Sequence, residues 1–324
     1  MNAPVFADIE DAARQIAGLA VRTPLLRSDA LDAATGAKVW VKAECLQRTG
    51  SFKFRGASNR ITRFTGAEKA AGVVAYSSGN HAQAVAAVAK IVGCPATIVM
   101  PADTPAIKVD STRSHGAEVV FYDRFTESRE GIATALAEAR GAVLVPPFEN
   151  PFIIAGQGTA GLEAAHQLDA EGARADLLYC CASGGGLMAG VSLAFDALSP
   201  DTQLWSAEPA GFDDTARSLA AGRRLANDPS ARSICDALLT PEPGELTWSV
   251  NSRLLDGGAV VTDDEALAAV AFAFRHLKLV LEPGGAVALA AALQRRPESQ
   301  GRTVLVIASG GNVDPATFSR AIAG

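Results

Sequence analysis

The sequence lacks the features that mark several classes of protein. Its 29 Lys and Arg residues are outnumbered by 35 Asp and Glu residues, so no basic excess is present for binding nucleic acid. No apolar run reaches the length that spans a membrane. The N-terminal residues show no basic segment before an apolar core, as a signal peptide would. We therefore expect no nucleic-acid or membrane partner and a cytoplasmic location.

Cysteine is also scarce, with five residues whose spacing matches no metal site. Cys180 and Cys181 lie next to each other in an apolar run, which is typical of small buried thiols. Unpaired thiols suit a reducing compartment. Hydrophobic residues make up 48% of the 324 positions and charged residues 20%, which is typical of a globular protein with room for two domains.

Apolar runs alternate with alanine-rich helical patterns along the chain. The clearest runs are residues 39–41, 73–76, 96–100, 177–180 and 303–307. Continuous apolar strands separated by helices indicate parallel sheets that are covered on both faces. We predict an α/β fold with two open, mostly parallel twisted sheets and helices on both faces. Prolines near residues 146–151 favour a domain crossing there, with a small inserted domain at 72–145 and a large domain at 1–71 and 146–324.

Lys53 is the most informative residue, because it lies between Phe52 and Phe54, just before a probable helix. Desolvation lowers the pKa of an amine, and the nearby cation of Arg55 is expected to lower it further. A neutral amine can attack a carbonyl and form a Schiff base. The alternative is a surface lysine whose stem covers apolar neighbours. The local sequence alone leaves both interpretations open.

Glycines at 184–186, flanked by Ser183 and Leu187, follow one predicted strand and open a helix. Glycines let backbone N–H groups approach an anion, and a helix N-terminus adds partial positive charge. The loop therefore predicts a phosphate site. It also fits the dinucleotide fingerprint, with Glu208 placed to hold a ribose hydroxyl. The loop alone does not separate a nicotinamide enzyme from a pyridoxal phosphate enzyme, but the dinucleotide interpretation leaves Lys53 unexplained.

Two further polar loops follow predicted strands. The hydroxyls of Ser77 and Ser78 and the N–H groups before His81 suit a carboxylate, and Asn80 offers both a donor and an acceptor. Simple capping of the next helix is the alternative. After the last strand, Ser309 can hydrogen-bond a ring nitrogen, although a polar turn explains it equally well in isolation.

Together these segments resemble the fold-type II pyridoxal phosphate enzymes, which have the tryptophan synthase β-like fold. The resemblance is specifically to the serine/threonine dehydratase and serine racemase family. The matching segments are residues 23–25, 42–44, 49–53, 77–81, 155–159, 183–187, 282–283 and 309–312. They span nearly the whole chain in the family's order, which makes the resemblance specific.

The resemblance implies a role for each of these positions. Lys53 would carry pyridoxal 5'-phosphate as a Schiff base and move the substrate's α-proton. The implied cofactor-binding residues are Phe52, Lys53, Asn80, Ser183, Gly184, Gly185, Gly186, Leu187, Glu282 and Ser309. Ser183 stands where the family usually has a glycine, which puts some phosphate affinity in question. The substrate would contact Ser77, Ser78, His81, Arg129 and Thr240, and Ser78 would also act as a second acid/base.

The family pattern also implies a cation site and an activity. Glu208, the carbonyl of Phe212, and Asp214 would bind Mg²⁺ or Ca²⁺, with an acidic solvated loop as the alternative. We expect an ammonia-lyase that converts L-threonine or L-serine to a 2-oxo acid, acting as a homodimer. The alternatives are a 3-hydroxyaspartate dehydratase, a serine or aspartate-type racemase on the same scaffold and, more remotely, a nicotinamide-dependent oxidoreductase. Arg129 suits a second substrate carboxylate if it faces the substrate pocket, with a surface helix cation paired with Glu130 as the alternative.

Overall fold

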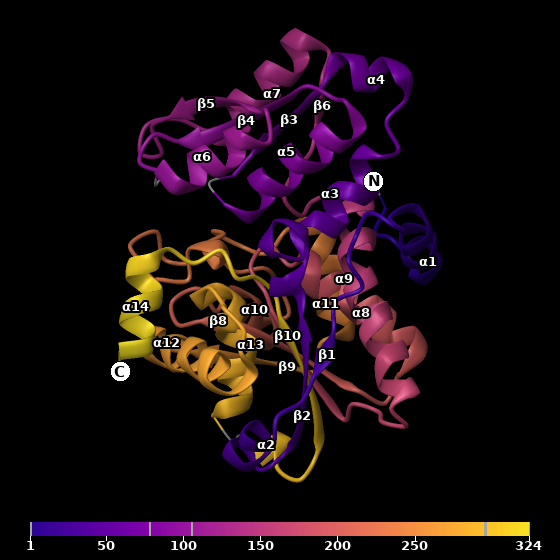
Figure 1. The fold of residues 1–324 in the computed structure, drawn as a ribbon, viewed down its shortest axis with the longest axis vertical. Helices are drawn as coiled ribbons and strands as arrows, with labels where there is room; N and C mark the ends of the chain where they lie inside the picture. Colours follow the sequence, from indigo (N-terminus) through magenta and orange to yellow (C-terminus); the bar gives the residue numbers. More distant parts are fainter. Residues whose placement is uncertain (1, 78, 105, 295–296, 324) are drawn as a thin grey trace.

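The computed structural model describes residues 2–77, 79–104, 106–294 and 297–323. These residues form two sheets, which lie in separate halves of the molecule with helices packed around each (Figure 1). The predicted α/β class with two mostly parallel sheets is confirmed. The division at residues 72 and 146 stays a prediction, although all strands of the smaller sheet lie within 72–145.

The larger sheet has six strands in the order β1-β2-β10-β7-β8-β9. Their bounds are β1 (Leu25–Leu26), β2 (Lys38–Ala43), β7 (Leu177–Cys181), β8 (Gln203–Pro209), β9 (Gly257–Val261) and β10 (Thr303–Ala308). Only β1 is antiparallel to its neighbour within this sheet. Strand β7 is buried along its whole length, as expected for a parallel strand covered on both faces.

The smaller sheet has four parallel strands in the order β5-β4-β3-β6. Their bounds are β3 (Val73–Tyr76), β4 (Ala96–Pro101), β5 (Glu118–Tyr122) and β6 (Val143–Leu144). Alternate residues of β3 enter different cores: Val73 and Ala75 join one cluster, whereas Val74 joins another. Helices therefore cover both faces of this sheet, because successive side chains of a strand point to opposite sides.

The helices connect the strands in the pattern of a doubly wound fold. Their bounds are α1 (Phe6–Gln15), α2 (Asp29–Thr35), α3 (Lys53–Ile61), α4 (Gly66–Ala71), α5 (Asn80–Val92), α6 (Ala106–Ser114), α7 (Arg129–Arg140), α8 (Pro151–Ala170), α9 (Gly186–Leu198), α10 (Asp214–Ala221), α11 (Glu245–Leu254), α12 (Asp263–Phe272), α13 (Pro283–Leu293) and α14 (Pro315–Ala323). Helices α5 and α7 pack on the smaller sheet, and α13 packs on β10, β7 and β8.

Helices α8 and α9 pack closely against each other in the half that contains the larger sheet. Gly190 permits this contact, since a Cβ atom there would lie 2.4 Å from the carbonyl oxygen of Ile154 and 2.5 Å from the nitrogen of Gly158. Helix α8 begins where Asn150 Oδ1 accepts hydrogen bonds from the N–H groups of Phe152 and Ile153. The packing holds the N-terminal end of α9, and with it the loop at 183–186.

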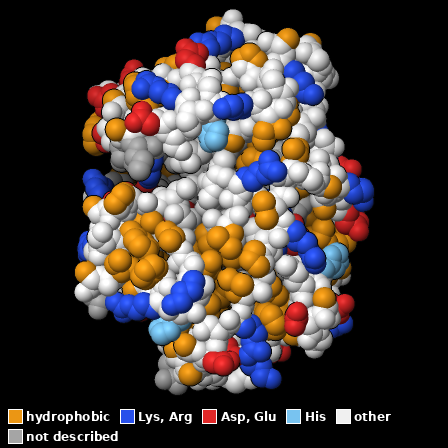
Figure 2. Space-filling model, viewed as in Figure 1, with side chains coloured by type: hydrophobic (Ala, Val, Ile, Leu, Met, Phe, Trp, Pro, Cys, Tyr) orange, Lys and Arg blue, Asp and Glu red, His pale blue; other side chains and the backbone are white. Residues whose placement is uncertain are grey.

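The distribution of exposed apolar side chains differs between the two halves of the molecule. In Figure 2 the larger apolar patches lie on the half that contains the six-stranded sheet. Exposed apolar surface is typical of contact between proteins. The expected homodimer stays a prediction. Within the described ranges, none of the helices combines the length and apolar character needed to cross a membrane.

Candidate active site

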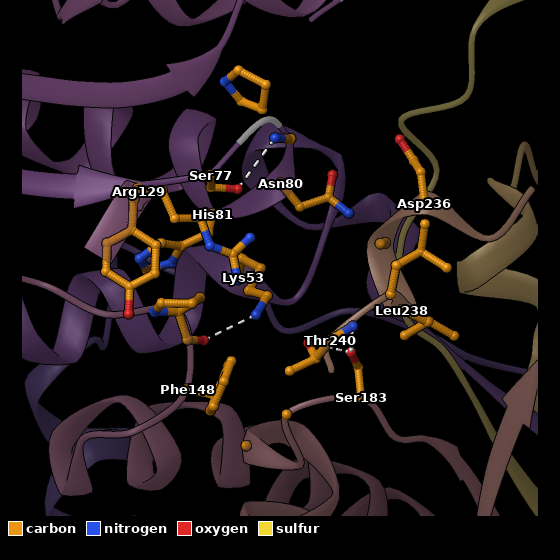
Figure 3. A pocket seen from close by; sticks show the side chains of 18 of the residues that line it. Lys53, Ser77, Asn80, His81, Arg129, Phe148, Ser183, Asp236, Leu238 and Thr240 are labelled. Atoms are coloured by element: carbon orange, nitrogen blue, oxygen red, sulfur yellow. Dashed lines mark hydrogen bonds between the residues drawn. The ribbon is translucent and has the colours of Figure 1, made fainter. Parts of the chain in front are cut away.

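A cavity of about 530 Å³ lies between the two sheets. Loops that follow β3, β7 and β10 line it, together with the N-terminal residues of α3. Ligands of open α/β sheets bind beyond the carboxyl ends of the strands, and this cavity has that position. In Figure 3, Lys53, Ser77, His81 and Arg129 lie on one side of the cavity, while Ser183, Leu238 and Thr240 face them.

Lys53 is the first residue of α3 and its side chain points into the cavity (Figure 3). Its Nζ donates a hydrogen bond of 2.9 Å to the carbonyl oxygen of Pro147 and lies 5.1 Å from the centre of the Phe52 ring. Burial lowers the pKa of Lys53 to about 8, although Cys181 and Glu282 partly oppose this. The amine is therefore neutral far more often than that of an ordinary lysine, and it is available as a nucleophile.

The expected contribution of Arg55 to this pKa is wrong. Its buried guanidinium is bound by Glu44 and by Glu163, with contacts of 2.7 to 2.8 Å. The same Glu163 also pairs with buried Lys42 at 2.7 Å. An ion-paired arginine exerts little net field on its surroundings. The desolvated position of Lys53, rather than Arg55, lowers the pKa of the amine.

The residues of the glycine loop line the cavity. Gly185 has φ 88°, and a Cβ there would lie 2.8 Å from Thr247 Oγ1. The loop carbonyls are bound from outside: Thr247 donates to the Gly184 carbonyl at 2.6 Å, and Asn251 donates to the Gly185 carbonyl at 3.3 Å. With its carbonyls held by α11, the loop can direct its N–H groups and the N-terminus of α9 towards an anion.

Ser183 fits this loop without strain. It is not among the described non-glycine residues with positive φ, so the position does not require glycine. Its hydroxyl donates a hydrogen bond of 2.6 Å to Thr240 Oγ1 and accepts one of 3.3 Å from the Thr240 N–H. Thr240 lines the cavity as expected of a substrate contact, but its hydroxyl is bonded to the glycine loop.

Asn80 lies at the centre of a small polar network. Its Nδ2 donates to Glu282 Oε1 at 2.5 Å, and its Oδ1 accepts from Asn312 Nδ2 at 2.7 Å. Burial and the nearby charge of Asp236 raise the pKa of Glu282 to about 8. The carboxyl group of Glu282 is therefore mostly protonated at neutral pH. The network fixes the amide of Asn80 at the cavity wall, where it can meet a ring hydroxyl.

Ser309 and Phe52 complete the wall of a site for a flat ring. Both line the cavity, and the Phe52 N–H donates to the Ser309 carbonyl at 3.1 Å. The Cys181 thiol donates to Ser309 Oγ at 3.2 Å. The prediction that Cys180 and Cys181 are buried thiols is confirmed. No local pattern indicated that Cys181 would lie in the cavity.

Three of the predicted substrate residues, Ser77, Ser78 and His81, belong to the stretch of sequence that follows β3 and runs into the first turn of α5. Ser77 Oγ accepts a hydrogen bond of 3.2 Å from the Gly79 N–H. His81 Nε2 lies 2.9 Å from the carbonyl oxygen of Val145, so we assign the ring proton to Nε2. Burial, and then the charge of Lys53, lower the pKa of His81 to about 3. Ser78, predicted as a catalytic and substrate-binding residue, lies outside the described residues.

Arg129 opens α7 at the cavity wall. Its Nε donates to Glu130 at 2.7 Å, and the guanidinium stacks 5.5 Å from the centre of the Tyr76 ring. Within the described ranges, neither terminal nitrogen of Arg129 has a protein partner. Two other cations of the cavity, Lys108 and Arg124, are ion-paired with Asp236 and Asp103 through their terminal nitrogens. Arg129 is therefore the best placed of the three to bind an anionic ligand.

The predicted cation residues lie at the end of β8, which contains Glu208, in the following loop with Phe212, and at the start of α10 with Asp214. Glu208 accepts hydrogen bonds of 2.8 Å from the N–H groups of Thr215 and Ala216. Burial and the charge of Asp214 raise the pKa of Glu208 to about 8, and burial raises that of Asp214 to about 6. Asp214 Oδ2 is buried with no hydrogen-bond partner in the described part of the chain. An unpartnered oxygen beside a second carboxylate fits a hard cation.

The cation residues do not form a complete set of side-chain ligands. Across residues 2–77, 79–104, 106–294 and 297–323, no group of three or more His, Cys, Asp and Glu side chains could hold a metal ion. A cation at this position would need oxygen atoms from the backbone and from water. The predicted cation site of Glu208, Asp214 and the Phe212 carbonyl stays a prediction.

Comparison with known proteins decides between the two cofactor interpretations. The family model described as "Pyridoxal-phosphate dependent enzyme" matches residues 16–310. The chain belongs to this family. The alternative dinucleotide interpretation also fails on geometry, because Glu208 does not line the cavity and bonds the N–H groups of Thr215 and Ala216 instead.

Members of the pyridoxal-phosphate family with assigned activities resemble the whole chain. An L-threo-3-hydroxyaspartate ammonia-lyase of Pseudomonas sp is 43% identical over 100% of both chains. An L-threo-3-hydroxyaspartate ammonia-lyase of Saccharomyces cerevisiae is 38% identical over 100% of this chain and 98% of its own. The structure of maize serine racemase matches with a TM-score of 0.92 at 40% identity, covering 99% of this chain and 97% of its own. The predicted fold-type II ammonia-lyase and racemase family is confirmed.

The cavity fits pyridoxal phosphate at each of its parts. Lys53 offers a poorly solvated amine, Phe52 and Ser309 offer a ring site, and the glycine loop is a cradle that a Cβ atom would fill. Several contributing residues were not identified from the sequence. They are Lys108, Pro147, Phe148, Cys181, Asp236, Leu238, Thr247, Asn251 and Asn312. The proline pair at 146 and 147 indicated a domain crossing rather than a cavity wall, and Asn312 belongs to the matching segment 309–312 without an assigned role.

Proposed function

We propose that this protein is a pyridoxal phosphate-dependent ammonia-lyase whose substrate is L-threo-3-hydroxyaspartate. Arg129 carries the proposal, because it lines the cavity with both terminal nitrogens available for a second substrate carboxylate. The two relatives that act on this substrate match the chain from end to end. The expectation of L-threonine or L-serine, which have no second carboxylate, receives less support than the 3-hydroxyaspartate alternative.

In the proposed reaction, different residues of the cavity take the α-proton and bind the two carboxylates of the substrate. When bound, pyridoxal phosphate supplies an aldehyde that reacts with amines and a ring that withdraws electrons from the substrate's α-carbon. The Nζ of Lys53, with its pKa lowered to about 8, takes the proton from the α-carbon. The first-turn N–H groups of α5 lack helical partners and orient the α-carboxylate. The guanidinium of Arg129 binds the second carboxylate through two parallel hydrogen bonds.

The overall reaction breaks three bonds of the substrate, the Cα–H, Cβ–O and Cα–N bonds, and the β-carbon gains a proton as the 2-oxo acid forms. The α-carbon loses a proton and the β-carbon loses its hydroxyl group, so that water leaves. The amino group is then replaced by the oxygen of a second water, giving a 2-oxo acid and ammonia. The net change is therefore the loss of ammonia alone, with no oxidant or reductant consumed.

A racemase remains the second candidate, because the maize serine racemase structure superposes on nearly the entire chain. Racemisation requires a proton donor on the face of the substrate opposite Lys53. The predicted donor, Ser78, lies outside the described residues. The product formed from L-serine distinguishes the two activities, since a racemase gives D-serine whereas a lyase gives pyruvate and ammonia.

A substrate panel tests the proposed function. We expect the protein to release ammonia and a 2-oxo acid from L-threo-3-hydroxyaspartate with a higher kcat/KM than from L-serine or L-threonine. The reason is the additional charged contact at Arg129, and hydrogen bonds to charged groups contribute roughly 1.5–3 kcal/mol. Ammonia release that is faster from L-threonine or L-serine would contradict the proposed substrate, and an absence of ammonia from all three would contradict the lyase.

We also propose that Mg²⁺ or Ca²⁺ binds at Glu208, Asp214 and the Phe212 carbonyl. The buried and unpartnered Oδ2 of Asp214 supports this proposal. Calorimetric titration of the EDTA-treated protein with each cation measures binding without relying on activity. We expect Asp214→Asn to abolish binding. The control Asp213→Asn removes the adjacent charge, which pairs with Arg217, and should retain binding. Binding unchanged in Asp214→Asn would contradict this site.

A further inference from the structure

The glycine loop is joined to the β8–α10 region through Thr240. The Ser183 hydroxyl donates a hydrogen bond of 2.6 Å to Thr240 Oγ1 and accepts one of 3.3 Å from the Thr240 N–H. A glycine at position 183 would have no side chain to form either bond. The serine therefore creates a connection between the loop and the segment that contains Thr240.

The connection continues from Thr240 to the predicted cation site. The Nδ2 of Asn227 donates hydrogen bonds to the Thr240 carbonyl at 3.0 Å and to Asp214 Oδ1 at 2.6 Å. The Asn227 N–H donates to the Pro241 carbonyl at 2.7 Å, and the Asn227 Oδ1 accepts from Arg217 at 2.5 Å. Asn227 is 8% exposed and Asp214 is fully buried. A continuous hydrogen-bonded path thus runs from Asp214 to Ser183.

The two ends of this path lie at the two proposed ligand sites. At one end, Asp214 Oδ2 has no partner within the described ranges, so the carboxylate is fixed on one side only. At the other end, Ser183 precedes the glycines whose carbonyls Thr247 and Asn251 hold, so the path adds a second restraint on the loop. A ligand that orders one end of a hydrogen-bonded path reduces the entropic cost of ordering the other end.

We propose that Asn227, Thr240 and Ser183 act as positioning residues that couple the Asp214 site to the glycine loop, so that a divalent cation and pyridoxal phosphate bind with positive cooperativity. The coupling rests on the proposed cation site and is independent of which amino acid is the substrate. By thermodynamic linkage, the cation strengthens cofactor binding by the same factor as the cofactor strengthens cation binding.

Cofactor affinity tests the coupling without reference to turnover. The full-length protein is freed of pyridoxal phosphate, and its Kd for the cofactor is measured from the absorbance of the bound form, in EDTA and in saturating Mg²⁺. For the natural sequence we expect Mg²⁺ to lower this Kd by roughly threefold to tenfold, the range of a single well-formed hydrogen bond. The Kd for Mg²⁺, measured by calorimetry, should fall by the same factor once the cofactor is bound.

A matched pair of variants tests whether the coupling runs through the Ser183 hydroxyl. Ser183→Ala removes the hydroxyl that bonds Thr240, so its cofactor Kd should no longer respond to Mg²⁺ while its Mg²⁺ affinity without cofactor stays unchanged. Ser192→Ala is the control: it also removes one buried hydroxyl from the segment that contains α9, but that hydroxyl has no partner in the described part of the chain. The control should keep the full response, and urea unfolding confirms that both variants fold.

Three results would overturn the proposal. A cofactor Kd that bound Mg²⁺ leaves unchanged in the natural sequence would exclude coupling. A full response in Ser183→Ala would exclude this path. Failure of both Mg²⁺ and Ca²⁺ to bind would remove the cation site and with it the coupling, while leaving the proposed lyase activity untouched.

Discussion

Lys53 combines three properties that an amine nucleophile needs. It lies at the cavity wall, its Nζ is held by the Pro147 carbonyl at 2.9 Å, and burial lowers its pKa to about 8. The sequence predicted the direction of this pKa shift correctly from the flanking phenylalanines. It could not predict that Arg55 would be neutralised, because its partner Glu163 lies 108 positions away and no local pattern indicated that Glu44 would turn towards it.

The pH dependence of cofactor binding follows from this shift. Because only the neutral amine reacts with an aldehyde, the rate at which the cofactor-free protein takes up pyridoxal phosphate should rise with pH and level off above about pH 8, rather than near the ordinary lysine value of 10.5. Stopped-flow absorbance measures this rate, with N-acetyl-lysine as the control amine. A rate that rises in parallel with the control through pH 10 would contradict the shift, and Lys53→Ala should show no covalent uptake.

The glycine loop is the element whose function depends most directly on its backbone. Its predicted role as a phosphate site rested on the strand, the glycines and the following helix, and the structure has each of these. The contribution of α11, where Thr247 and Asn251 hold the loop carbonyls, could not be predicted. Those residues lie about sixty positions further along the chain and have no local pattern that indicates contact with a loop.

Replacing Gly185 should separate loop conformation from general stability. Gly185 and Gly93 have φ values of 88° and 71°, but a Cβ atom added at Gly185 would lie 2.8 Å from Thr247 Oγ1, whereas one added at Gly93 would meet nothing within 4 Å. Both alanine variants should lose roughly 1–2 kcal/mol of folding free energy from the left-handed backbone. Only Gly185→Ala should weaken cofactor binding, by roughly tenfold or more. Urea unfolding and cofactor titration test this, and equal cofactor affinities in the two variants would contradict it.

At the scale of the whole molecule, the cavity exists because two sheets meet. Lys53 and the glycine loop belong to segments around the six-stranded sheet, whereas Ser77, Asn80 and Arg129 follow strands of the smaller sheet. The order of apolar runs predicted two sheets, and their strand ends predicted where a ligand would bind. The sequence could not predict which cations of the cavity would be ion-paired, since Lys108 meets Asp236 across a separation of 128 residues.

The most direct test of the account is the substrate preference of Arg129→Met, compared with that of Arg124→Met. Both arginines line the cavity, but Arg124 is ion-paired with Asp103 through a terminal nitrogen, whereas Arg129 is paired with Glu130 through Nε. The account predicts that Arg129→Met lowers kcat/KM for L-threo-3-hydroxyaspartate by roughly 10- to 100-fold, because the second carboxylate of this substrate loses its charged contact. The kcat/KM for L-serine, which has no second carboxylate, should change little. Arg124→Met should leave the ratio of the two values unchanged. An equal loss on both substrates in Arg129→Met, or no loss on either, would contradict the account.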